Sequence, residues 1–221
     1  MPKRALLERR PWLLASLITA IAYFLLKDAT FPGLYLYVLE AAALMLLGAY
    51  ALLRHSGRDA RAVAGFMGAS GIGVVSVELD FYIGALVLML ALALGIGLFV
   101  KHRRANLETT QKAAAVALLL LTPLICWRLP FERTDALTFG IFGLALGGMA
   151  ATAWASRFPR YRVGLGGLLI VGAGIVTIGR AGPLHDSEWP GMVAWPLFYL
   201  GHFLICTGAI QTLRGGLVQK R

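Results

Sequence analysis

The feature that most constrains this chain is a succession of eight apolar runs, each close to the length that a helix needs to cross a bilayer. The runs span roughly residues 12–26, 33–53, 61–78, 81–100, 112–127, 135–155, 163–179 and 191–213, and charged, Gly or Pro residues bound each of them. They are apolar on all sides, as helices in a lipid-embedded bundle require. The short alternating strands of a membrane barrel are absent. We therefore predict an all-α fold, a polytopic transmembrane bundle of eight helices that forms one domain over residues 1–221.

The composition excludes several classes of protein. Of 221 residues, 58% are hydrophobic and 14% are charged, which is outside the range of soluble globular chains. Cys126 and Cys206 lie inside apolar runs, so we expect packing residues rather than metal ligands or redox centres. Serine-nucleophile, zinc-protease and paired-cysteine motifs do not occur. The sequence thus predicts no metal site and no cofactor, and leaves carboxylate, His and Arg chemistry.

The basic residues follow the order of the loops. All but four of the 21 Lys and Arg residues occupy the two ends and alternate loops; the four exceptions are Lys27, Arg128, Arg133 and Arg180. The positive-inside rule then places both termini and the loop at 101–112 in the cytoplasm. The net charge of +10 is explained by basic loops that meet anionic lipid headgroups, without a nucleic acid partner. We expect a multi-pass protein of the bacterial cytoplasmic membrane.

The basic N-terminus followed by a short apolar run also resembles a secretory signal peptide. No small-x-small cleavage site precedes Lys27, and removal of the run would break the alternation of charge. We therefore expect this first run to be a retained span.

Small residues recur at four-residue spacing in three of the runs. Examples are Gly65, Ala69 and Gly73 in the third run and Gly143 with Gly147 in the sixth, and the seventh is rich in glycine from 164 to 174. Such faces let two helix backbones approach closely in lipid. Tight helix packing is the interpretation we favour over a ligand role.

Glu40 is the strongest candidate for a functional side chain. It lies about seven residues into the second run, roughly 10 Å below the outer boundary at 1.5 Å per residue. An ionisable group at that depth must face a partner or a wet cavity. We predict that Glu40 points into the bundle, with Tyr37 as a neighbour in the cavity wall. Two interpretations remain open: a proton donor, or a residue that pairs two helices.

Four other polar residues have competing interpretations. His202 lies near the middle of the last run, as a packed core residue or as a catalytic group. Glu78 and Asp80 end the third run, either at the mouth of a cavity or at the membrane interface. Arg180 ends the seventh run, where it either holds a lipid phosphate or snorkels to the headgroups.

The chain resembles the lysoplasmalogenase family of membrane proteins, also named the YhhN family. The segment from Arg162 to Gly174 is similar to the family's G-A-x-L-F-x-x-S-D helix, and Tyr199-Leu-Gly-His-Phe-Leu-Ile205 is similar to its Y-Y-x-x-Q-x-L-I segment. The chain departs from the pattern at two positions. Ala173-Gly174 stands where the family has Ser-Asp, and Gly73-Val74 stands where it has Gly-Asp.

The resemblance implies a hydrolase that cleaves the vinyl ether bond of a lysophospholipid by general acid catalysis. Such chemistry needs a buried proton donor, a carboxylate that stabilises the cation, and a cationic group for the phosphate. The residues available are Glu40 as the acid, Asp80 or Glu78 as the carboxylate, and Arg180 for the phosphate. His202 completes the catalytic set, with Tyr199 and Tyr37 as substrate-binding residues.

Two alternatives remain. The first is a catalytically impaired family member that binds or senses membrane lipid. The second, a small transporter, is weaker, because the cytoplasmic halves of the runs contain almost no ionisable residue.

Overall fold

The computed structural model describes residues 11–29 and 32–218 of the chain, with the side chains of 216–218 left out. Part of the predicted cytoplasmic charge lies outside these residues. It comprises Lys3, Arg4, Arg9 and Arg10 at one end and Lys220 and Arg221 at the other.

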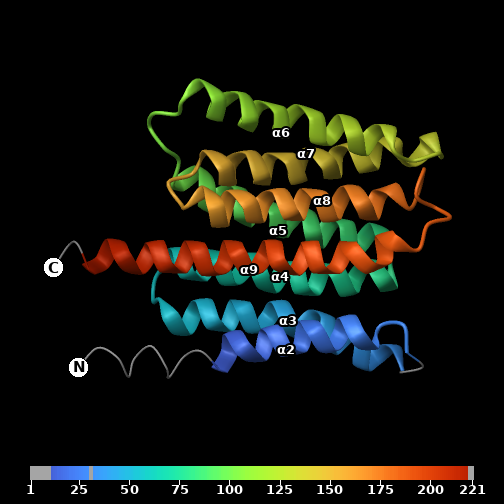
Figure 1. Cartoon of the computed structure of the whole chain (residues 1–221), viewed down its shortest axis with the longest axis horizontal. Helices are drawn as coiled ribbons and strands as arrows, with labels where there is room; N and C mark the ends of the chain where they lie inside the picture. The colour runs from blue at the N-terminus through green and yellow to red at the C-terminus, as the bar shows by residue number, and fades with distance from the viewer. Residues whose placement is uncertain (1–10, 30–31, 219–221) are drawn as a thin grey trace. The chain divides into compact units, whose positions relative to one another are not determined.

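The described residues fold into eight α-helices, each of which matches one of the predicted runs (Figure 1). The helices are α2 (Pro11–Leu26), α3 (Gly33–Arg54), α4 (Arg58–Leu79), α5 (Phe81–Lys101), α6 (Thr109–Arg128), α7 (Arg133–Ala155), α8 (Leu165–Gly179) and α9 (Trp189–Val218). A short π-helical segment, η1 (Arg160–Gly164), leads directly into α8. Seven of the eight are long and apolar enough to span a membrane once η1 is counted with α8, and α2 is shorter at 16 residues. The chain is therefore a multi-pass, all-α membrane protein, as predicted.

Contacts divide the chain into two compact units, whose boundaries fall within α5 and α9. Of the described residues, the first unit comprises 11–29, 32–94 and 209–218, and the second comprises 95–208. Each unit is described in turn.

In the first unit, α3 packs against both α2 and α4. The Ser16 hydroxyl of α2 donates a hydrogen bond of 2.6 Å to the Ala43 carbonyl of α3. On the other side of α3, a β-carbon on Gly71 would lie 2.9 Å from the Ala41 carbonyl oxygen. The backbones of α3 and α4 are therefore so close that a glycine is needed between them.

In the second unit, small residues set the distance between helices in the same way. A β-carbon on Gly143 would lie 2.7 Å from that of Cys126, and one on Gly147 would lie 2.5 Å from the Leu118 carbonyl oxygen. Between α8 and α9 the relation is reciprocal, because Gly166 and Gly201 each face the other's carbonyl oxygen, at 2.6 and 2.7 Å from the added β-carbon. These contacts confirm the predicted role of the small-residue faces.

Alternate loops of the second unit meet at the same end. At one end the Arg104 backbone N–H donates to Ala155 at 3.1 Å, and the Arg157 backbone N–H donates to His102 at 2.8 Å. At the other end the Phe131 backbone N–H donates to the Ala181 carbonyl at 3.0 Å. The first pair of loops contains most of this unit's basic residues, in keeping with the alternation of charge in the sequence.

The glycine contacts predict the effect of a single methyl group. Gly147→Ala should lower the midpoint of thermal unfolding in detergent, because the methyl group would lie 2.5 Å from a carbonyl oxygen and 2.9 Å from the Thr122 β-carbon. Gly97→Ala is the control, since nothing lies within 4 Å of its added β-carbon. Alanine is favoured over glycine within a helix by about 1 kcal/mol, so the control should not lose stability. Equal midpoints for the two variants would contradict the close approach of α6 and α7.

Candidate functional site

Glu40 lies in the interior of the first unit, as the sequence predicted. Its side chain is 6% exposed, and it shares the buried side of α3 with Ala43 and Leu44. Within the described part of the chain, one of its carboxyl oxygens, Oε2, is buried and accepts no hydrogen bond. Burial of an unsatisfied polar atom costs free energy, so this oxygen marks Glu40 as a candidate functional residue.

Two other side chains act on Glu40 from neighbouring helices. Tyr23 of α2 forms a side-chain hydrogen bond with the Glu40 carboxyl group, and Glu78 at the end of α4 interacts with it electrostatically. Glu78 is exposed, whereas Glu40 is buried. The first unit thus brings together a phenol, a buried carboxyl and an exposed carboxyl from three helices. Sequence reasoning missed Tyr23, because a tyrosine near the end of an apolar run is usually an interfacial anchor.

Asp80 has a structural role at the turn between α4 and α5. Its carboxylate accepts a hydrogen bond of 2.9 Å from the Ile83 backbone N–H, in the first turn of α5. Its own backbone N–H donates to the Ser76 carbonyl at 2.8 Å and so closes the last turn of α4. A single exposed residue therefore caps two consecutive helices, which supports the interface interpretation of Asp80.

Tyr37 lies one turn before Glu40 and is half-buried. Its ring leans back along α3, and its Cζ atom would lie 3.8 Å from a β-carbon on Gly33. The aromatic ring therefore covers the start of α3.

The two positions that depart from the family pattern lie in packed surroundings. A β-carbon on Gly174 would lie 2.5 Å from the Leu146 Cδ2 atom, so α7 occupies the place of a side chain there. Val74 is half-buried, and a β-carbon on the preceding Gly73 would lie 2.7 Å from Leu88 Cδ2. Glycine at 174 therefore serves helix packing in this chain.

His202 is a buried residue of the second unit, with 1% of its side chain exposed. Its Nδ1 lies 2.8 Å from the Phe198 carbonyl oxygen, one turn earlier on α9. A carbonyl can only accept, so Nδ1 carries a proton and donates it in this contact. Within the described residues no group of three or more His, Cys, Asp or Glu side chains is placed to hold a metal ion.

Tyr199 and Arg180 have very different surroundings in the second unit. Tyr199 is 4% exposed, and its ring centroid lies 6.1 Å from that of Trp195 and 6.2 Å from that of Phe203. Arg180 follows the last residue of α8 and is exposed, and its backbone carbonyl faces His185 Nδ1 at 3.3 Å. The structure thus places Tyr199 in an aromatic column and Arg180 at the edge of a loop.

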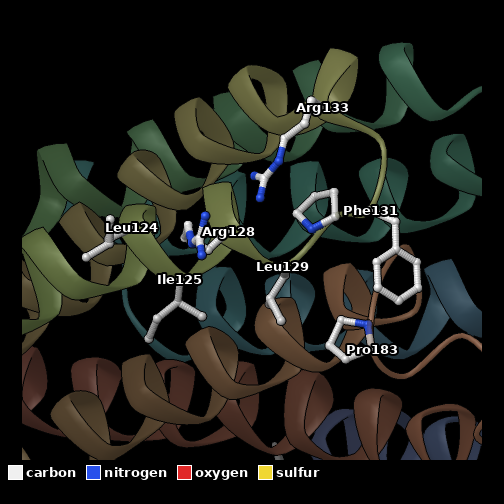
Figure 2. Close-up of a pocket in the computed structure, with 8 residues that line it drawn as sticks. Leu124, Ile125, Arg128, Leu129, Phe131, Arg133 and Pro183 are labelled. Atoms are coloured by element: carbon white, nitrogen blue, oxygen red, sulfur yellow. The ribbon is translucent and has the colours of Figure 1, made fainter.

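A pocket of about 560 Å³ lies at the end of the second unit where α6 passes into α7 (Figure 2). Arg128 and Arg133 point into it, between apolar walls that include Leu124, Ile125 and Phe131. Sequence reasoning missed this pair and treated both arginines only as exceptions to the alternation of charge. The sequence did contain a signal for this pocket: Arg128 and Arg133 are two cations close together in a loop of the set that is otherwise acidic.

Comparison with known proteins gives one result. The sequence model of the YhhN family matches residues 35–209. No curated protein and no solved structure shows a significant match.

The capping role of Asp80 predicts a change in stability. Asp80→Ala should lower the free energy of unfolding by about 1 kcal/mol, because it removes the acceptor for the Ile83 N–H. Asp80→Asn should retain most of the stability, since an amide oxygen accepts the same hydrogen bond. Thermal unfolding in detergent measures both variants. An unchanged midpoint for Asp80→Ala would argue against the cap.

Proposed function

From the membership of this chain in the YhhN family, which includes lysoplasmalogenases, we propose that it is a lysoplasmalogenase-like membrane hydrolase. Its substrate would be a lysophospholipid with a vinyl ether bond, cleaved by general acid catalysis. The observation that carries the proposal is the buried Glu40, whose unpartnered oxygen lies in a cluster with Tyr23 and Glu78.

The difficult step of vinyl ether hydrolysis is transfer of a proton to carbon. In the proposed reaction the Glu40 carboxylic acid gives its proton to the alkene carbon distal to the ether oxygen. The product is an oxocarbenium ion, whose positive charge is shared by the other alkene carbon and the oxygen. Tyr23 holds the Glu40 carboxyl in position, because the two side chains are hydrogen-bonded. A positioned acid of this kind contributes about 10²- to 10⁴-fold to the rate.

Water completes the reaction. The Glu78 carboxylate stabilises the cation through space and takes a proton from the attacking water molecule, which adds to the carbon bound to oxygen. The resulting hemiacetal breaks its bond to the ether oxygen while its hydroxyl proton passes to that oxygen, which gives a fatty aldehyde and the glycerophospho alcohol. The proton taken from water returns to Glu40. The cycle uses side chains and one water molecule, with no cofactor.

The other residues predicted from the sequence have secondary roles in the proposal. Asp80 is a second choice for the carboxylate, after Glu78, because it already caps α5. Tyr37 remains a candidate for substrate contact in the first unit. In the second unit, Arg180 and Tyr199 remain candidates for substrate binding and His202 remains a candidate catalytic group.

The proposal includes an orientation in the membrane. We place both termini in the cytoplasm, treat the whole chain as one eight-helix domain, and assign it to the bacterial cytoplasmic membrane. The alternation of basic residues along the sequence supports this orientation.

A second candidate is a family member that binds lysophospholipid without turnover. The residues that favour it are Val74 and Gly174, which replace two carboxylates of the family pattern. Gly174 is also closely packed against Leu146, so a larger side chain at this position would displace Leu146.

Replacement of Glu40 by Gln separates the two candidates. The amide preserves shape and hydrogen bonding but cannot donate a carboxylic proton, so Glu40→Gln should keep the fold and reduce aldehyde release by at least about 100-fold. The assay follows fatty aldehyde released from lysoplasmalogen by the purified protein. Glu188→Gln is the matched control, since this exposed acid lies in the loop before α9.

Each outcome of that assay decides something. Equal turnover by Glu40→Gln and the unaltered chain would exclude Glu40 as the proton donor. No aldehyde from the unaltered chain, together with binding of the intact lipid, would favour the non-catalytic candidate. A Glu40→Gln variant that only loses thermal stability would show a helix-pairing residue.

The orientation can be tested by labelling of single cysteines. Asn106→Cys and Asp186→Cys place exposed thiols in two loops, and the native Cys126 and Cys206 are buried. We expect a membrane-impermeant maleimide to label position 186 in intact cells and position 106 only after permeabilisation. The reverse pattern would overturn the proposed topology.

A further inference from the structure

One face of α6 in the second unit has a continuous stripe of side chains. Residues at 114, 117–118, 121–122 and 125 recur every three or four positions, so they lie on one side of the helix. Facing them across a groove of about 380 Å³ are Leu168, Val171 and Ile175 of α8. The groove is lined almost entirely by apolar atoms, and Trp154 lies among its lining residues.

The groove adjoins the arginine pocket. Ile125 lines both spaces, and Arg128 continues the same stripe of α6 by one more turn. From Ala114 to Arg128 the stripe extends over 15 residues, and the 14 steps between its ends are roughly 21 Å along the helix at 1.5 Å per residue. That length is about two thirds of the hydrocarbon core of a bilayer. An apolar groove of this length therefore ends at a charged pocket.

The positive charges of the two arginines in the pocket are not balanced by a nearby acidic side chain among the described residues. Arg133 is exposed, donates to the Trp127 carbonyl at 3.3 Å, and lies 5.7 Å from the Trp127 ring. Among the described residues neither Arg128 nor Arg133 forms an ion pair with an acidic side chain. Glu132 is the nearest acid in sequence, but it precedes α7 as its N-cap residue and does not line the pocket. The guanidinium groups thus face a space with no compensating negative charge (Figure 2).

We propose that the arginine pocket and the groove together form a binding site for a single-chain phospholipid. Arg128 and Arg133 hold the phosphate, and one acyl chain lies along the apolar stripe between α6 and α8. Guanidinium groups suit this task, because they present several N–H donors to phosphate oxygens and stay charged. Basic pockets between transmembrane helices are a known way to bind anionic headgroups.

The site distinguishes a lysophospholipid from simpler ligands. Free glycerol phosphate would leave the apolar groove empty, and a monoacylglycerol would leave the two cations without an anion. A ligand with both a phosphate and an acyl chain matches the arginine pocket and the groove together. The proposal is independent of hydrolysis, because none of these residues belongs to the cluster around Glu40.

The test is a binding measurement with three probes: a lysophospholipid, a monoacylglycerol with the same acyl chain, and glycerol phosphate. We expect the lysophospholipid to bind most tightly. The double variant Arg128→Gln with Arg133→Gln should weaken its binding by at least about tenfold and leave the monoacylglycerol unchanged. Arg58→Gln with Arg61→Gln is the control, since it removes two exposed arginines at the start of α4.

A groove-filling variant tests the other half of the site. Ala117→Phe should weaken binding of both acylated probes, whereas Val116→Phe, at an exposed position of α6 that does not line the groove, should weaken neither. A lysophospholipid with a photoreactive group at the end of its chain should label α6 and α8. Thermal unfolding of each variant verifies that the fold is intact.

Several results would overturn the site. They are unchanged lysophospholipid binding by the Arg128 and Arg133 variant, an equal loss in the Arg58 and Arg61 control, and photolabelling outside α6 and α8. Turnover that depends on Glu40 with no effect of the arginine variant on binding would reject this site and keep the proposed hydrolase. Binding that depends on the arginines with no turnover would do the opposite.

Discussion

A backbone amide in hydrocarbon has no water to bind, so its partner must lie within its own helix. That constraint fixes the length of the spans and leaves helix association without a hydrophobic driving force, because the lipid is as apolar as leucine. Close packing of the helix backbones must then provide the stabilisation that the hydrophobic effect does not. The glycines at 147, 166 and 201 provide that packing, since each brings a neighbouring carbonyl oxygen to where a β-carbon would stand. Helix contacts in this chain therefore depend on the absence of side chains.

The lack of water in the hydrocarbon also explains why Glu40 is unusual. A carboxyl group on a membrane-spanning helix loses its hydration, and one of its oxygens remains without a hydrogen-bond partner in the described part of the structure. Tyr23 satisfies the group only in part. A residue kept only to pair helices would be better served by a complete set of hydrogen bonds. The incomplete set of hydrogen bonds is in keeping with the proposed role of Glu40 as a proton donor.

The sequence predicted the helices well because their signals are local. Hydrophobic length, Gly and Pro breaks and the charge of each loop can be read without knowledge of the fold, and the eight helices match the eight runs. The partners of the candidate residues could not be predicted in this way. Tyr23 beside Glu40, and Arg128 with Arg133 around one pocket, depend on which helices pack together. Asp80 was assigned from its residue type and its place at the end of the third run, and its part in capping α5 appears only in the geometry of the turn.

The proposed hydrolysis needs a proton donor and a cation, and these two groups should not bind each other. Protonation of an alkene needs an acid that retains its proton until the substrate arrives, whereas phosphate binding needs a permanent cation. A guanidinium group bonded to Glu40 would stabilise its carboxylate form and remove the proton donor. The groups that act on Glu40 in the first unit are a phenol and a carboxylate, and the arginine pair belongs to the second. The proposed proton donor and the proposed phosphate ligands are thus provided by different residues, with a different chemical neighbourhood for each.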